Sequence, residues 1–161
     1  MDSMQDFLER LPNDRWYSAE QDLWLKEEGQ GWRVGANAMI TSLGKFMVFY
    51  PKPEGTVLDR GDSLGVMETW KTAFGIASPF ACRILESNGA VVRDIGVARD
   101  RPYDQGWLFL LKPTESLNPT ELFKTYDQYM AWLRGPGAGQ FDHLRPPQDP
   151  SDLIYDPLRG M

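Results

Sequence analysis

The chain has 161 residues, a net charge of -6, and 42% hydrophobic and 12% aromatic residues. This length fits one domain with a real core, and the acidic charge, with no dense Lys/Arg stripe, excludes nucleic acid as an expected partner. No apolar stretch reaches the roughly 20 residues that span a bilayer and the start lacks a signal-peptide pattern, so we expect a cytoplasmic protein without a membrane partner.

The chain contains one cysteine, Cys82, and one histidine, His143. An intrachain disulfide and a cysteine metal cluster are therefore excluded. His143 lies in a Pro-rich segment, which argues against Ser-His-Asp and Cys-His catalysis. We expect no metal site and no catalytic residues, and we expect Cys82 to fill core space in an apolar strand.

Twelve prolines and fifteen glycines favour many short strands over long helices. Residues Gln5 to Leu11 predict a short helical turn that Pro12 stops. A Gly-turn hairpin follows, and then a short helix or 3₁₀ segment. The strands expected up to residue 58 are 24–28, 32–35, 45–50 and 56–58, with the short helix at 36–43.

A polar turn at 59–62 precedes further strands at 64–67, 76–85, 90–93 and 106–111, each bounded by turn residues. Trp107 alternates with Phe109 and Leu111, so we expect Trp107, and also Tyr103, to be core residues. Many short strands predict a mainly β fold, a flattened barrel or sandwich.

One convincing helix begins after Asn118, which can cap it, with Pro119 at the first position and Glu121 three residues after the cap. Apolar residues then recur at helical spacing as far as Leu133. Gly135 ends the pattern, and the Pro/Gly-rich remainder is too poor in apolar residues to extend the core. We therefore divide the chain into an N-terminal helical turn (1–15), a domain (16–134) and a flexible tail (135–161).

Lys71 lies between the apolar run Leu64 to Met67 and the apolar run Ile76 to Leu85. Short, small or polar residues separate the runs, so the pattern predicts a hairpin with Lys71 near its tip. An amine there reaches outward, clear of the core. Taken alone, such a lysine is usually only a solvated charge.

The residues around Lys71 resemble the H protein of the glycine cleavage system, a lipoyl carrier with a hammerhead β fold related to lipoyl and biotinyl domains. The likeness covers about residues 16 to 133 and rests on order and spacing. Its residues are Tyr17, Glu20, Trp24, Gly35, Leu43-Gly44, Gly55, Gly65-Val66, Glu68, Lys71, Ser78-Pro79, Pro102-Tyr103, Gly106-Trp107-Leu108 and Lys112-Pro113.

The resemblance implies that lipoate is attached covalently to Lys71 and that Glu68 helps the lipoate-attaching enzyme to recognise the hairpin. Trp70 either packs on the hairpin base or contacts lipoate and partner enzymes. A biotin carrier is similar in fold, but methionines typically flank its lysine, whereas Trp70 and Thr72 flank Lys71 here.

Our prediction of the pathway in which the protein acts is based on positions where the chain departs from the family pattern. Gln21 stands where a histidine is usual, Cys82 replaces a small glycine, and the Pro51-Lys52-Pro53 stretch and the long tail are atypical. These departures make the chain look closer to the H-like lipoate-binding proteins of heterodisulfide-reductase-like sulfur oxidation. Its partners would be a sulfur-transfer protein or the reductase-like complex, together with a dithiol-oxidising dehydrogenase.

Three alternatives stay open at this point. The first is the aminomethyl carrier of glycine cleavage, with glycine decarboxylase and aminomethyltransferase as partners. The second is an unmodified β-barrel interaction module. The third, an enzyme that uses Lys71 as a nucleophile, requires a pocket that depresses the lysine pKa, which an exposed hairpin tip does not provide.

Overall fold

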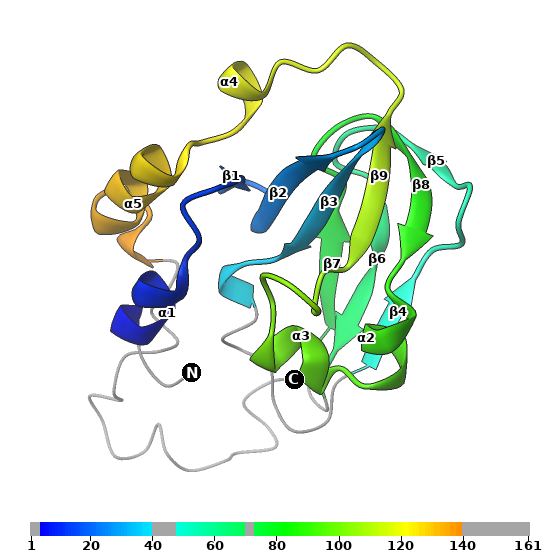
Figure 1. Ribbon diagram of the computed structural model, residues 1–161, viewed down its shortest axis with the longest axis horizontal. Coiled ribbons are helices and arrows are strands. Elements are labelled where there is room, and N and C mark those ends of the chain that lie inside the picture. Colours follow the sequence, from blue (N-terminus) through cyan, green and yellow to red (C-terminus); the bar gives the residue numbers. More distant parts are fainter. Residues whose placement is uncertain (1–3, 40–47, 70–72, 140–161) are drawn as a thin grey trace, which may run out of the picture.

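Two antiparallel sheets form the body of the protein (Figure 1). The computed structural model describes residues 4–39, 48–69 and 73–139. The larger sheet has the order β1 (Trp16–Ser18), β2 (Leu23–Glu28), β3 (Gly31–Ala36), β9 (Phe109–Pro113), β8 (Cys82–Ser87), β5 (Val57–Leu58). The smaller sheet has the order β4 (Val48–Pro51), β6 (Ser63–Glu68), β7 (Ala73–Ala77).

Five short helices accompany these sheets within the described residues: α1 (Met4–Arg10), α2 (Gly89–Arg93), α3 (Gly96–Asp100), α4 (Pro119–Leu122) and α5 (Tyr126–Arg134). The mainly β fold with short helices and a C-terminal helix is therefore confirmed. No helix in the described part of the chain has the length and apolar character that crossing a membrane requires.

The main core lies between the two sheets and is built from buried side chains of both. Phe49 of the small sheet meets Phe109 of the large sheet edge-on, with ring centroids 5.5 Å apart. Strand β2 is buried on both faces at its start: Leu23 and Leu25 enter this core, while Trp24 points the other way. The predicted filling of core space by Cys82 is confirmed, since its side chain is fully buried here.

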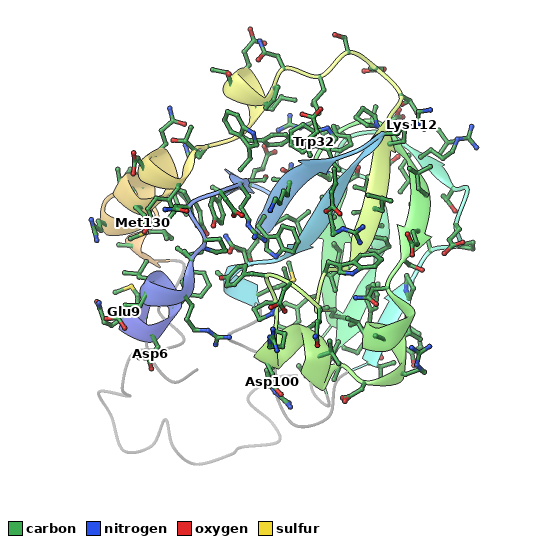
Figure 2. All side chains as sticks on the ribbon, in the orientation of Figure 1. Asp6, Glu9, Trp32, Asp100, Lys112 and Met130 are labelled. Carbon is green, nitrogen blue, oxygen red and sulfur yellow. The ribbon has the colours of Figure 1, made fainter. Side chains whose placement is uncertain are left out.

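A second core lies where α1 and α5 cover the β1–β2 side of the large sheet (Figure 1). Tyr17 of β1 stacks on Tyr129 of α5 with ring centroids 4.7 Å apart. The predicted helical turn at 5–11 is confirmed as α1, whose Phe7 and Leu8 are buried, while Asp6 and Glu9 lie on its outer side (Figure 2).

The strand predicted at 90–93 is wrong, because these residues belong to α2. The Asn88 side chain accepts a hydrogen bond from the Ala90 N–H and thereby caps the helix. Its amide also donates to the carbonyls of Gln105 and Trp107, at 2.8 Å each. The Asn-Gly pair therefore begins a helix; β-branched Val91 and Val92 had suggested a strand.

The single strand predicted over 76–85 is also wrong. β7 ends at Ala77 and β8 begins at Cys82, and the two strands belong to different sheets. The Ser78 hydroxyl donates to the Phe80 carbonyl at 2.5 Å, which holds the corner between them. A change of sheet leaves the apolar pattern continuous, so the pattern cannot reveal it.

The last predicted strand, 106–111, is shifted to Phe109–Pro113. Gly106 lies in a turn, and a Cβ there would come within 2.6 Å of the Ala98 Cα of α3. Trp107 packs half-buried against the second core and not beside Phe109 and Leu111, so the alternation proposed for these three residues is wrong. Tyr103 is likewise half-buried against the second core.

The predicted C-terminal helix is two helices, α4 and α5. Lys124 interrupts them because its N–H and C=O both pair with Tyr17 at 2.8 Å. Asn118 caps α4 as expected, but the capping box lies at Thr125 and Gln128, not at Glu121. Of the short helix or 3₁₀ segment predicted at 36–43, the described residues show a 3₁₀ turn at 38–39, and residues 40–47 and His143 lie outside the described residues.

Candidate functional site: the end of the β6–β7 hairpin

Strands β6 and β7 form the antiparallel hairpin that the apolar runs predict, with a bulge near Ser63 and Gly65. Its inner face carries Leu64, Met67 and Ile76, which are fully buried in the main core. Burying each of these side chains contributes roughly 1.5–3 kcal/mol relative to exposure. The hairpin is therefore held to the large sheet along its length.

The base of the hairpin is fixed by a second set of contacts. The Gly61 N–H donates to the Ser78 carbonyl at 2.9 Å, and the Ser78 N–H donates to the Asp62 carbonyl at 2.8 Å. Gly61 has φ +88°, a conformation that glycine adopts without strain. This polar turn at 59–62, predicted from the sequence, ties the two strands together at the end opposite their connection.

At the other end, Glu68 and Ala73 are direct Cα partners, and Glu68 also pairs with Val48 of β4. Residues 69–72 connect the two strands, so Lys71 belongs to this connection. Of the predicted site residues, the structure places Glu68, exposed at the end of β6. Trp70 and Lys71 lie outside the described residues, and their roles stay predictions.

The outward-facing positions of the small sheet form two rows across its strands. Val48, Glu68 and Ala73 form the row at the hairpin end, and Tyr50, Val66 and Gly75 form the next. Val48 is 42% exposed and Tyr50 55% exposed, whereas Phe49 between them is buried. Sequence reasoning missed this face, because Val48, Phe49 and Tyr50 are all apolar and their pattern does not distinguish the inner from the outer side of the strand.

Cys82 lies outside this site. Its thiol is buried, 3.3 Å from the Ser78 hydroxyl oxygen, and burial raises the pKa of the thiol. A buried thiol of raised pKa is a poor nucleophile. Among the described residues, no group of three or more His, Cys, Asp or Glu side chains could hold a metal ion.

Gln21 is not part of the hairpin. It is buried in the connection between β1 and β2, where its backbone N–H donates to the Ser18 hydroxyl at 3.1 Å and its side-chain oxygen accepts from the same hydroxyl. The glutamine that stands here in place of the usual histidine therefore changes a contact inside the protein and not its surface.

Residues 15–134 match the sequence model of the glycine cleavage H-protein family. The chain belongs to this family. H proteins of the glycine cleavage system are its curated relatives: one from Thermus thermophilus is 33% identical over 113 residues, covering 70% of this chain and 88% of the relative. Glycine cleavage system H protein 5 of Aquifex aeolicus is 31% identical over 117 residues, covering 70% of this chain and 77% of the relative.

A crystal structure of a glycine cleavage system H protein from Mycobacterium marinum has the same fold. It aligns with a TM-score of 0.63 at 26% identity and covers 75% of this chain and 97% of that chain. The resemblance drawn from the Lys71 region is thus confirmed at the level of the family, and with it a carrier protein that is not an enzyme.

Proposed function

We propose that this H-protein family member carries lipoate in amide linkage on the Nζ of Lys71 and shuttles a lipoate-bound intermediate between enzymes. The observation that carries the proposal is the pairing of Glu68 with Ala73. It closes the hairpin two residues from Lys71, a stretch of chain that spans at most about 7 Å. The attachment point therefore belongs to the end of an anchored hairpin.

The residues at this end suit a covalently attached group that must be reached by enzymes. The inner face of the hairpin is buried, while Glu68, Ala73 and Gly75 are exposed. An attaching enzyme can approach without disturbing the core. We assign Glu68 to recognition by that enzyme, since its carboxylate stands at the last pair before the connection, and Trp70, the direct neighbour of Lys71, to contact with lipoate or a partner.

Lipoate supplies a dithiolane that interconverts between disulfide and dithiol forms. The chain's own contribution is to hold the arm on a rigid support and to present a surface that partner enzymes bind. With this function, the partners of the protein would be a lipoate-attaching enzyme, the enzymes that load and unload the arm, and a dithiol-oxidising dehydrogenase.

For the pathway, the names of the relatives favour the aminomethyl carrier of glycine cleavage, with glycine decarboxylase and aminomethyltransferase as partners. Sulfur oxidation with a heterodisulfide-reductase-like complex rested partly on Gln21. Because Gln21 is buried against Ser18, it offers partner enzymes little surface to read, and that argument loses weight.

Intact-mass measurement tests the attachment. The protein, produced with lipoate and a lipoate-attaching enzyme, should gain the mass of one lipoyl group, and the Lys71→Arg variant should gain none. The Lys52→Arg variant, whose lysine follows β4, is the matched control and should be modified like the wild type.

An unshifted wild-type mass with several attaching enzymes, or an undiminished shift in Lys71→Arg, contradicts the proposal. An unshifted mass together with a partner that binds Lys71→Ala as well as the wild type would favour the unmodified interaction module.

A further inference from the structure

The large sheet has an outer face, on the side opposite the main core, and α1 and α5 cover it over β1 and β2 (Figure 1). On β3, β9 and β8, every second residue enters the main core and the residues between face outward. Arg33, Leu110 and Glu86 are paired in one outward row, and Lys112 and Arg83 are paired in the next. Glu86, Lys112 and Arg83 are exposed, so this part of the face is open to solvent.

Two pairs of like charges stand directly opposite each other on this face: Lys26 with Arg33, and Arg83 with Lys112. Such pairs destabilise a sheet. Lys26 and Arg33 each have an acidic partner, at 3.0 and 2.8 Å. Arg83 and Lys112, called the cation pair below, form no ion pair with a described residue. In a chain of net charge -6, this is a site for a segment that carries carboxylates.

A hollow of about 450 Å³ lies on the same face and has aromatic walls formed by Trp24, Tyr103 and Trp107. The Arg15 guanidinium lies 4.6 Å from the centre of the Trp24 ring, and the Arg33 guanidinium lies 4.2 Å from that of Trp107. Three of the charged residues that line the hollow are basic and two are acidic. The hollow therefore offers apolar surface inside a rim that is slightly positive.

The hollow and the cation pair are close enough for one peptide to cover both. From Arg33, which lines the hollow, Lys112 stands one strand over and two residues along, about 8 Å away (Figure 2). Arg83 stands one strand farther, about 12 Å from Arg33. The face thus fits an extended segment whose carboxylates lie about four residues from its apolar side chains.

Residues 149–156 of this chain have that composition. They read Asp-Pro-Ser-Asp-Leu-Ile-Tyr-Asp, with three aspartates, no lysine and no arginine around the apolar triplet Leu153-Ile154-Tyr155. In an extended chain Asp149 lies about 13 Å from Leu153, which matches the distance from the cation pair to the hollow.

The segment can also reach the face. The described residues end at 139, shortly after α5, which itself covers the outer side of the large sheet. β8 is the fourth strand from β1, about 19 Å across the sheet. The chain from 140 to 149 spans up to about 35 Å, so it is long enough to cross that distance.

We propose that residues 149–156 dock on this face of the same chain, with the apolar triplet in the hollow and Asp149 and Asp152 against the cation pair. This inference is independent of lipoate attachment at Lys71. Docking brings carboxylates to two unpaired cations and removes the triplet from water. The tether gives the segment an effective concentration in the millimolar range, so it excludes acidic segments of other proteins from the face.

Paramagnetic relaxation on the full chain tests the docking. A nitroxide label on Gln148→Cys stands beside the segment, and the buried thiol of Cys82 does not compete for the reagent. The amide signals of Leu110 and Lys112 should lose most of their intensity, because the label lies over their strand. The amide signal of Gly75, in the small sheet on the other side of the main core, should keep its intensity.

Charge reversal tests the contact with the cation pair. Adding Arg83→Glu/Lys112→Glu to the labelled chain should restore the lost intensity, because the aspartates then meet like charges. Adding Lys52→Glu/Arg93→Glu instead makes the same change in net charge away from the outer face and should leave the signals weak. Thermal unfolding of each variant checks that the fold persists.

The reverse exchange in the tail supplies a rescue. Asp149→Lys/Asp152→Lys alone should also restore the intensity. Combined with Arg83→Glu/Lys112→Glu, it should weaken the signals again, because opposite charges face each other once more. Damage to the sheet by the two glutamates could not be reversed by lysines in the tail.

Three outcomes overturn the proposal. Full intensity at Leu110 and Lys112 in the labelled chain shows that the segment does not dock there. Signal loss that survives Arg83→Glu/Lys112→Glu contradicts the contact with the cation pair. If isotope-labelled chain without nitroxide loses these signals when it is mixed with nitroxide-labelled chain without isotope, the face binds the tail of a second copy.

Discussion

Gly65 of β6 lies so close to the backbone of its β4 neighbours that a Cβ built on it would overlap the Tyr50 carbonyl oxygen and approach the Pro51 Cα to 2.9 Å. Only a glycine permits this approach. The contact brings β4, with its exposed Tyr50 and Val48, alongside the hairpin that carries the proposed attachment point. Gly65 therefore allows β4 to lie this close to β6.

We predict that Gly65→Ala destabilises the protein by about 1–3 kcal/mol, because backbone atoms must move to accept the methyl group. Gly75→Ala, on the paired strand but above open surface, is the matched control. It should be neutral or stabilising by up to about 1 kcal/mol, since alanine restricts the unfolded chain. Urea unfolding of both variants measures the difference, and equal effects would contradict the assigned role of Gly65.

The buried carboxyl of Asp22 predicts an unusual pH dependence. Asp22 accepts hydrogen bonds from the Ala38 N–H at 2.8 Å and the Met39 N–H at 2.6 Å. Burial outweighs these bonds and raises its pKa from 3.8 to about 7. Between these two values the folded protein keeps a proton that the unfolded chain has lost, so this group's contribution to stability falls as pH rises from about 4 to about 7 and is constant above.

The Asp22→Asn variant should lose this pH dependence. Asparagine keeps one acceptor oxygen and tolerates the positive φ of 60° at this position. Relative to wild type, the variant's free energy of unfolding should improve by about 3 kcal/mol between pH 4 and pH 7. Denaturant unfolding across that range measures it, and parallel curves for the two proteins would refute the shifted pKa.

Asp14 provides a control, because the pKa of its carboxyl is shifted in the opposite direction to that of Asp22. Hydrogen bonds from Arg15 and Lys26 lower the pKa of its carboxyl from 3.8 to about 2. The stabilisation it contributes is present above pH 4 and is lost as pH falls toward 2. Asp14→Asn should therefore differ from wild type by a constant amount at pH 5 to 8, with a small effect because this ion pair is half-exposed.

The capping box of Thr125 and Gln128 begins α5 as a helix separate from α4. The Thr125 hydroxyl accepts from the Gln128 N–H at 3.2 Å, and the Gln128 side chain accepts from the Thr125 N–H at 2.9 Å. Thr125→Ala should cost about 1 kcal/mol, because α5 carries Tyr129 and Leu133 into the second core. Thr125→Ser should restore most of it. Asn118→Ala should cost less, since α4 buries no residue.

The sequence predicted elements well where local pattern and tertiary environment agree. Local signals, namely glycines, prolines and apolar spacing, define the β2–β3 hairpin, the α1 turn and the polar turn at 59–62. These signals do not depend on distant contacts. Prediction from the sequence failed where contacts between residues distant in the chain determine the local structure. Asn88 begins a helix because its amide finds the carbonyls of Gln105 and Trp107, and Lys124 breaks a helix because it pairs with Tyr17.

The candidate site shows the same division. The hairpin end around Glu68 follows from two apolar runs and the short connection between them, so it was predictable. The outer face at Val48 and Tyr50 was not, because its position beside the hairpin depends on the pairing of β4 with β6. Strand order is a tertiary property that spacing along one strand does not encode.

The last prediction concerns the pathway. When the lipoylated protein is incubated with glycine decarboxylase and glycine, the decarboxylase should release carbon dioxide from glycine and the lipoyl group should accept the aminomethyl group, whereas Lys71→Arg should support neither step. Gln21→His is the matched probe of the departure that suggested sulfur oxidation. Because Gln21 is buried against Ser18, this change should alter stability more than loading. A wild-type protein that stays unloaded, but is loaded after Gln21→His or accepts sulfur from a sulfur-transfer protein, would instead support sulfur oxidation.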